Sequence, residues 1–383
     1  MSYPLQPLSS LGVIQTGSTP LTSKNEYWGG DIPFVTPGDL DQILPVETTP
    51  RTLSDEGAQQ SRMLQKGSVM VCCIGSLGKI GIAGRTVVTN QQINSVEFDQ
   101  KKIWPKFGFY ACKRLKPQLL TMAPATTIAI VSKSKFGHLE IPVPPLSEQR
   151  RIAAILDQAD ALRVKRREAL AQLDSLTQSI FIEMFGDPVI NPMKWPIKKF
   201  GDVGSLDRGV SKHRPRNAPE LLGGAHPLVQ TGEIANCDGY VRSHNSSYSE
   251  FGLRQSKLWP KGTLCITIAA NIAKTGILTF DACFPDSVVG FKAEKPETVE
   301  FVRVWLSFLQ QALEAAAPES AQKNINLAIL RALNIPLPPI SLQQAFAERV
   351  TSTESLRGTH RVALTELDTL FASLQHRAFR GEL

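Results

Sequence analysis

The chain contains 383 residues, more than one hydrophobic core normally serves, and so predicts two or three domains. Its 42% hydrophobic and 20% charged residues are ordinary for a globular protein, and no apolar run approaches the roughly 18–20 residues that cross a membrane. The first residues lack the pattern of a secretory leader, so we expect a cytoplasmic protein without a membrane partner. The six cysteines form no C-x-x-C pair, which favours buried thiols over zinc ligands or disulfides.

Residues 1–146 predict a compact domain of short strands and loops. Lys66-Gly67 introduces the apolar run SVMVCCIG, which is typical of a buried strand. Glycines then recur every third residue from Gly75 to Gly84. Because Gly78-Lys79 is followed by Ile80 rather than by Ser or Thr, the pattern of a phosphate-binding P-loop is not fulfilled. We favour a tight turn between strands.

Residues 147–187 predict one long helix with Ser147 as its N-cap. Apolar residues recur at alternating steps of three and four, with Leu162 and Leu176 among them and Arg166 as the one polar position. This period of 3.5 predicts a seam that packs against another helix. The helix extends to Phe185, and 39 residues correspond to roughly 58 Å. We interpret the RVKRR run within it as a solvated or partner-facing surface rather than a DNA contact.

The stretch from Ile141 to Phe185 recurs 194 residues later, from Ile335 to Phe379. Residues 341–383 therefore predict a second long helix, with Ser341 as its N-cap and His360 in the place of Arg166. Its seam includes Leu356 and Leu370. Two helices with one seam in one chain are expected to pack on each other.

The intervening residues 188–340 repeat the first domain more loosely. The string VTPGDL is matched by VQTGEI, and KGSVMVCCI is matched by KGTLCITI, at distances of 194 and 195 residues. Residues 1–146 and 186–340 carry net charges of +4 and +3, whereas both helices are neutral. This placement is expected if the two domains contact phosphate, although many proteins that bind no nucleic acid have a similar surplus.

The order of these elements resembles the specificity subunit of type I restriction–modification systems. Gly17–Leu40 resembles a common opening of that family's target-recognition domains, and Gln322–Leu330 resembles the close of one. The strings EQRRIAAILDQAD and LDSLTQSIFIEMFGDP resemble its central helix. The resemblance covers essentially the whole chain.

The resemblance implies an α/β (α+β) fold with an internal pseudo-twofold repeat. Target-recognition domains at 1–146 and 188–340 would be separated by two long antiparallel coiled-coil helices, 147–187 and 341–383. Each domain would read half of a split DNA site in the major groove. The helices would fix the spacer and dock two adenine methyltransferase (M) subunits, which the restriction (R) subunits join. S-adenosylmethionine, ATP and Mg are expected on those partners, and no cofactor is expected in this chain.

Two departures from the family pattern affect these expectations. The Gln-Lys-Asn-Ile-Asn element of the second domain is absent before the first helix, so contacts assigned to it do not transfer to the first domain. Leu342 stands where the first helix has Glu148, so the two helix starts need not bind partners equally.

No catalytic motif stands out in the chain. It lacks the [N/D]-P-P-[aromatic] loop of adenine methyltransferases, a Walker A loop and an H-E-x-x-H pair. We therefore predict a DNA-recognition subunit with no catalytic or metal-binding residue. Two alternatives remain: a coiled-coil scaffold whose domains bind proteins, and a stand-alone DNA-binding or antirestriction protein.

Candidate DNA contacts lie in both domains. Arg208–Arg216 places five potentially cationic side chains in a loop broken by proline, and such groups pair with guanine or phosphate, with a solvated loop as the alternative. For the polar residues on the matching turns near 36 and 230, turn stabilisation is the interpretation we favour. The predicted DNA contacts are Thr36, Lys66, Ser76, Lys79, Arg85, Arg208, Lys212, His213, Arg214, Arg216, Gln230, Thr231, Lys261, Asn271, Lys274, Lys323 and Asn324.

Overall fold

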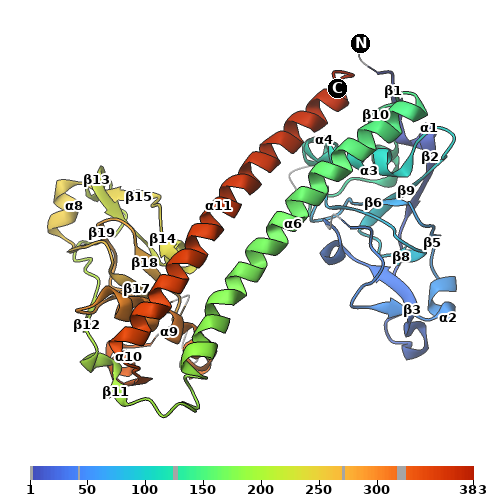
Figure 1. Cartoon of the computed structure of the whole chain (residues 1–383). Coiled ribbons are helices and arrows are strands. Elements are labelled where there is room, and N and C mark those ends of the chain that lie inside the picture. Colours follow the sequence, from blue (N-terminus) through green and yellow to red (C-terminus); the bar gives the residue numbers. More distant parts are fainter. Residues whose placement is uncertain (1–2, 42–43, 124–127, 270–271, 317–324) are drawn as a thin grey trace. The chain divides into compact units, whose positions relative to one another are not determined.

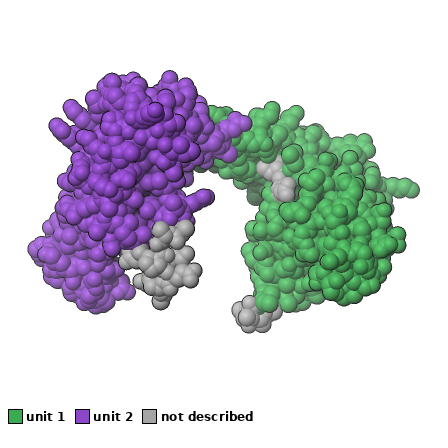
Figure 2. Space-filling view, turned by 90° about the horizontal axis from the view of Figure 1, so that it is seen from below, with its two compact units in different colours: residues 1–169, 360–383 green, residues 170–359 purple. Residues whose placement is uncertain are grey.

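The computed structural model of the chain describes residues 3–41, 44–123, 128–269, 272–316 and 325–383. The chain divides into two compact units, coloured separately in Figure 2. Unit 1 contains residues 1–169 and 360–383, and unit 2 contains residues 170–359. Each unit therefore combines one predicted domain with half of each long helix.

Unit 1 begins with short strands and ends its domain at the long helix α6 (Figure 1). Its strands are β1 (Leu5–Pro7), β2 (Gly12–Thr16), β3 (Trp28–Val35), β4 (Thr52–Leu53), β5 (Met63–Leu64), β6 (Val69–Cys72), β7 (Ile80–Ile82), β8 (Val87–Thr89), β9 (Ile93–Phe98) and β10 (Glu140–Pro142). Its helices are α1 (Leu8–Leu11), α2 (Asp55–Gln59), α3 (Pro105–Lys113), α4 (Lys116–Met122) and α5 (Lys133–Gly137), followed by α6 (Leu146–Phe185). The strands form sheets in the orders β2-β9-β6-β7, β4-β3-β8-β5 and β1-β10.

Unit 2 repeats this arrangement. Its strands are β11 (Ile197–Lys199), β12 (Ser205–Arg208), β13 (Leu222–Leu228), β14 (Gly239–Val241), β15 (Ser246–Tyr248), β16 (Leu258–Trp259), β17 (Leu264–Thr267), β18 (Thr275–Leu278), β19 (Ala282–Cys283), β20 (Val288–Lys292) and β21 (Asn334–Pro336). Its helices are α7 (Thr231–Ala235), α8 (Glu250–Arg254), α9 (Pro296–Ala316), α10 (Leu327–Ala332) and α11 (Ile340–Ala378). The sheet orders β12-β20-β17-β18-β14, β15-β13-β19-β16 and β11-β21 match those of unit 1, with β14 added. The predicted internal repeat is thus confirmed.

The central strand of each unit is buried on both faces, as its continuous apolar sequence predicts. In β6, Val69 and Val71 pack in the core that contains α3, whereas Met70 lies in the core shared with the second sheet. In β17, Leu264 packs in the core that contains α9, and Cys265 faces the second sheet. Successive side chains of a strand point to opposite faces, so one strand contributes to two cores. The predicted tight turn after β6 is also present, with Gly75 and Gly78 at positive φ.

The long helices begin one residue before the serines that we predicted as N-caps. The carbonyl of Pro145 accepts the first helical bond from the Gln149 N–H (3.0 Å), so Ser147 lies inside the first turn of α6. The same pattern starts α11, where the carbonyl of Pro339 accepts from the Gln343 N–H (3.2 Å). The serine N-cap predictions are wrong because the prolines, whose φ suits a helix start, take the capping position.

A buried glutamine fixes each helix start to its own domain. The Gln149 side chain donates to the carbonyls of Lys102 (2.9 Å) and Pro144 (2.8 Å) and accepts from the Trp104 N–H (2.8 Å). In unit 2, the Gln343 side chain donates to the Pro338 carbonyl (2.8 Å) and accepts from the Thr298 hydroxyl (2.8 Å). The repeated glutamine therefore serves the same structural purpose in both units.

The two long helices pack antiparallel within each unit. In unit 1, Arg166 contacts the equivalent residue His360 (3.2 Å), as the shared seam predicts. Four leucines assigned to the seam are nevertheless exposed, and their exposed fractions are 53% for Leu162, 40% for Leu176, 47% for Leu356 and 49% for Leu370. The seam prediction is wrong at these positions because the helices also bury side chains against their domains, as Leu156 does in the unit 1 core. Among the described residues, no helix has the length and apolarity to cross a membrane.

Candidate nucleic-acid interface

Three loops of unit 1 meet at one end of the sheet β2-β9-β6-β7. The Gly17 N–H after β2 donates to the carbonyl of Ile93 (3.1 Å), and the Cys73 N–H at the end of β6 donates to the carbonyl of Gln92 (2.8 Å). These bonds bring together residues 17–19, 74–79 and 90–92, a set that we call edge 1. Loops at one end of a sheet are a common place for recognition residues because the strands hold them firmly.

Edge 1 carries uncharged amide side chains in addition to one lysine. The exposed Gln91 accepts from the Thr19 hydroxyl (2.6 Å), and Asn90 donates to the Gln92 side chain (2.8 Å). Lys79 reaches back from the same edge and donates to the carbonyl of Pro37 (3.2 Å). Amides offer both a donor and an acceptor, which suits them to the edges of bases.

The same end of unit 2 carries a cluster of arginines. The Gly209 N–H donates to the carbonyl of Val288 (2.8 Å), and the Ile268 N–H donates to that of Ser287 (3.0 Å). These bonds repeat those of unit 1 and join residues 208–216 to residues 285–287, a set that we call edge 2. The sequence pattern singled out these arginines as candidate DNA contacts but did not identify the residue that organises them.

That residue is Asp286, which contacts three arginines. Arg216 Nη2 lies 2.5 Å from Asp286 Oδ1, and Arg214 Nη2 lies 3.7 Å from Oδ2. Arg208 Nε donates to the Asp286 backbone carbonyl (3.0 Å). Asp286 therefore gathers three cations, two through its carboxylate and one through its backbone carbonyl, and edge 2 keeps a positive surplus that can meet phosphate or a base.

Several predicted contacts do not join these edges. Lys66 and Lys261 precede β6 and β17, at the opposite ends of those strands, and are exposed there. Arg85 lies beyond β7 and pairs with Asp31 (2.5 Å), and this hydrogen bond lowers the pKa of the Asp31 carboxyl. The positive charge of Arg85 is thus largely neutralised by Asp31.

The remaining predicted residues have local partners or exposed positions. The Thr36 hydroxyl and N–H both donate to Asp39 (2.8 Å each), as the turn-stabilising interpretation predicts, whereas the bond from Gln230 to Glu233 (2.7 Å) comes from its backbone N–H. His213 faces Glu220 at 3.6 Å. Ser76 lies in edge 1 and Lys212 in edge 2, Lys274 directly precedes β18, and Thr231 is the first residue of α7, while Asn271, Lys323 and Asn324 are outside the described residues.

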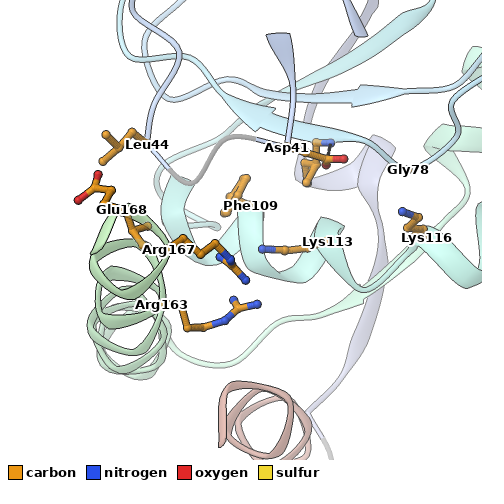
Figure 3. A pocket seen from close by; sticks show the side chains of 11 residues that line it. Asp41, Leu44, Gly78, Phe109, Lys113, Lys116, Arg163, Arg167 and Glu168 are labelled. Carbon is orange, nitrogen blue, oxygen red and sulfur yellow. Dashed lines mark hydrogen bonds between the residues drawn. The ribbon is translucent and has the colours of Figure 1, made fainter. Parts of the chain in front are cut away.

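Part of the RVKRR run forms an ionic joint in which Arg163 is largely buried, while Lys165 and Arg167 stay exposed, as the prediction of a solvated surface has it. Arg163 contacts Asp160 on α6 and donates to Asp368 on α11 (2.6 Å). Lys113 on α3 lies 3.7 Å from the same Asp160, and burial lowers the pKa of this lysine. Figure 3 shows Lys113, Arg163 and Arg167 around a pocket of about 620 Å³ in unit 1. The carboxylates of Asp160 and Asp368 balance these positive charges, so the cluster of ion pairs beside the pocket serves as a structural joint.

Unit 2 contains the same joint 194 residues later. Arg357 contacts Glu354 on α11 and Asp174 on α6. Arg242 of the domain completes the network and lies 2.9 Å from Glu354. The sequence repeat could have revealed these pairs, because Asp160 and Arg163 align with Glu354 and Arg357 at the offset of the helices.

Comparison with known proteins identifies the family. The family model described as type I restriction modification DNA specificity domain matches twice, over residues 6–173 and 192–363. The chain belongs to this family. The predicted family is confirmed, and its model describes a DNA specificity domain.

Members of the family from several organisms resemble the chain. The specificity subunit of the type I restriction enzyme MjaIX from Methanocaldococcus jannaschii is 25% identical over 57% of this chain and 54% of its own length. The EcoBI specificity subunit from Escherichia coli is 23% identical over 77% of this chain and 69% of its own. The chain thus spans about half the length of the first of these relatives.

A solved member of the family shares the fold. The crystal structure of the type I restriction-modification S subunit from M. genitalium superposes with a TM-score of 0.63, at 16% identity, over 99% of this chain and 96% of that chain. A chain from a structure of type I R-M complex assembly and conformational transition gives a TM-score of 0.58 at 17% identity, over 100% and 98% of the two chains. These likenesses confirm the predicted fold of two repeated domains with long helices.

Proposed function

We propose that this chain is the specificity subunit of a type I restriction–modification complex and reads a bipartite DNA site through edges 1 and 2. The observation that carries the proposal is the repetition of one loop framework with different polar side chains. A single framework that presents amides in one unit and arginines in the other is suited to two half-sites of different sequence. Base edges in the major groove differ in their donors and acceptors, so a change of side chain changes the sequence read.

Charge supplies the sequence-independent part of the binding. The two domains carry the whole positive surplus of the chain, whereas the long helices are neutral. Arginine and lysine side chains that neutralise phosphates release counterions, which favours binding to any duplex. Phosphate contacts would hold the domains on the DNA while base contacts select the site.

The exposed leucines support docking of two copies of one protein. Leu162 and Leu356 are equivalent by the repeat, and so are Leu176 and Leu370. Unit 1 contains Leu162 and Leu370, and unit 2 contains Leu356 and Leu176, so each unit presents one leucine of each kind. We propose that each pair docks one adenine methyltransferase subunit, which the restriction subunits then join. S-adenosylmethionine, ATP and Mg would be bound by those partners.

The helices are proposed to set the spacer between the half-sites. The helix α6 contains 40 residues, which corresponds to about 60 Å at 1.5 Å per residue. One turn of B-DNA spans roughly 34–36 Å, so half-sites about one turn apart lie within this length. Removal of one heptad from both α6 and α11 is expected to shorten the spacer of the recognised site.

Selection from a random duplex library tests the proposal. The full chain, assembled with an adenine methyltransferase subunit of its own system, is used to capture DNA, and the captured sequences are determined. We expect two short conserved blocks separated by a spacer of fixed length and free sequence. Failure of a correctly assembled complex to enrich any sequence would contradict DNA reading and favour a protein-binding scaffold.

A further inference from the structure

One position at the polar edges differs in chemical character between the units. Gln91 stands two residues before β9 in unit 1, and Asp286 stands two residues before β20 in unit 2, 195 residues later. We propose that this position determines base preference: Gln91 reads adenine in one half-site, and Asp286 positions Arg208 and Arg216 to read guanine in the other. This inference rests on the proposed function and assigns specificity to named residues.

The equivalence of the two positions follows from the backbone around them. Gly17 and Gly209 each donate to the first residue of the neighbouring strand, Ile93 or Val288. A Cβ on either glycine would lie 2.3 Å from two consecutive carbonyl oxygens, those of 89 and 90 in unit 1 and of 284 and 285 in unit 2. Only glycine permits this close approach, which fixes the following residue, Gln91 or Asp286, at the same place.

A second pair of hydrogen bonds confirms the match. The Ser61 hydroxyl donates to the carbonyl of Ser18 (3.4 Å), and the Ser256 hydroxyl donates to the carbonyl of Val210 (2.8 Å). Ser61 and Ser256 are also 195 residues apart. The loops after β2 and β12 are therefore held alike from two sides, and their side chains can be compared position by position.

At edge 2, Asp286 holds two arginines by one nitrogen each. Arg216 uses Nη2 on the carboxylate, and Arg208 uses Nε on the backbone carbonyl of Asp286. Among the described residues, no protein atom accepts from their other guanidinium nitrogens. Both arginines are exposed, so each presents a free pair of donors in a fixed orientation. Two parallel donors match O6 and N7 of guanine.

Fixed orientation is what separates base reading from phosphate binding. A phosphate attracts an arginine in many orientations, whereas bidentate pairing with guanine requires the guanidinium plane to be aligned. An aspartate beside the arginines lowers the local positive charge and therefore weakens a pure phosphate site. Its presence is understandable if orientation matters more than charge.

At edge 1, no arginine lies at the equivalent position, and Gln91 presents a carboxamide. Its Oε1 accepts from the Thr19 hydroxyl (2.6 Å), which orients the group. The second lone pair of Oε1 can accept from N6 of adenine while Nε2 donates to N7. A bidentate contact of this kind distinguishes adenine from the other bases.

Library selection with variants of the full chain, assembled with its methyltransferase, tests the assignment. Arg216→Lys keeps the positive charge but removes the paired guanidinium donors. We expect the preference for guanine in one half-site to fall by roughly ten- to hundred-fold. Gln91→Glu removes the donor and should replace adenine by another base in the other half-site only. Asp286→Ala should relax the guanine positions while non-specific affinity stays equal or rises. All three side chains lie at the surface, and unchanged thermal unfolding is the check on folding.

The outcomes separate the inference from the function on which it rests. Relaxation of one half-site by Arg216→Lys and of the other by Gln91→Glu supports the assignment. A split motif that survives both substitutions overturns the assignment and leaves the proposed function standing. If the Asp286→Ala complex binds DNA more tightly and its motif is unchanged, the arginines contact phosphate, and the assignment is again overturned. If the unsubstituted chain enriches no motif, the proposed function fails and the inference fails with it.

Discussion

Edges 1 and 2 share a backbone framework and differ in chemistry. The sheet orders, the close-packed Gly17 and Gly209, and the serine bonds to the neighbouring loop are common to both. The exposed side chains are amides at Gln91 and its neighbours in unit 1, and arginines around Asp286 in unit 2. The comparison shows that buried backbone contacts fix the positions of the loops in both units. The side chains on those loops can therefore differ and specify different targets.

The largest expected effect concerns the ionic joints, where the units differ in burial. Arg163→Ala leaves Asp160, which is 1% exposed, with only Lys113 at 3.7 Å. We expect a loss of roughly 3–5 kcal/mol because the buried carboxylate loses its close partner and keeps only the more distant lysine. Arg357→Ala should cost less, since Glu354 is less buried and keeps Arg242 at 2.9 Å.

The loss of stability in both variants is measured by urea unfolding, with hydrogen exchange as the probe of each unit. Arg167→Ala is the matched control, because Arg167 contacts Asp368 (3.2 Å) from an exposed position and should cost at most about 1 kcal/mol. Equal losses of stability for Arg163→Ala and Arg167→Ala would contradict a stabilising role of the ionic joint.

The buried glutamines give the next effect. Gln149→Leu leaves three backbone groups without their partner, one of them buried and two partly buried, and Gln343→Leu leaves one carbonyl and one hydroxyl. Each unsatisfied group costs about 1–3 kcal/mol, so we expect the substitution in unit 1 to be the more damaging. Chemical denaturation of the two variants compares them, and a larger loss for Gln343→Leu would contradict this ranking.

The exposed leucines test whether the two units bind the same partner. Leu162→Asp or Leu356→Asp should weaken methyltransferase binding by roughly ten-fold or more, because an exposed apolar contact is replaced by a charge. Stability should change little, since the side chains are half exposed. Sedimentation analysis of the assembled complex is expected to show one bound subunit instead of two for a single variant. Val189→Asp, at an exposed apolar residue outside the helices, is the control.

The smallest effect concerns phosphate contacts. Lys212→Ala at edge 2 should flatten the dependence of log Kd on log salt by about 0.9, as expected for one lost phosphate contact. Arg85→Ala should leave the slope unchanged, because Arg85 pairs with Asp31 away from edge 1. Triple substitution of Lys212, Arg214 and Arg216 should flatten the slope further, and an unchanged slope in that variant would remove edge 2 from the DNA surface.

Much of the fold could be predicted because the two copies of the repeat share apolar and turn-forming residues at equivalent positions. The buried strand at Val69–Cys72 and the long helices follow directly from local pattern. The exposed Leu162 was misassigned because a heptad pattern does not show that a helix has two packing partners. Asp286 and Gln91 were missed because their importance depends on backbone contacts between distant loops. The amide run at Asn90–Gln92 was the only local signal, and it resembles an ordinary turn.

The most direct test of the account maps methylation in a cell. The chain and an adenine methyltransferase subunit of its own system are expressed together in a host free of DNA methylation, and methylated adenines are located by single-molecule sequencing. The account predicts that every modified adenine lies in one split motif with two short half-sites and a constant spacer. Methylation at a single uninterrupted motif, or none from an assembled complex, would contradict it.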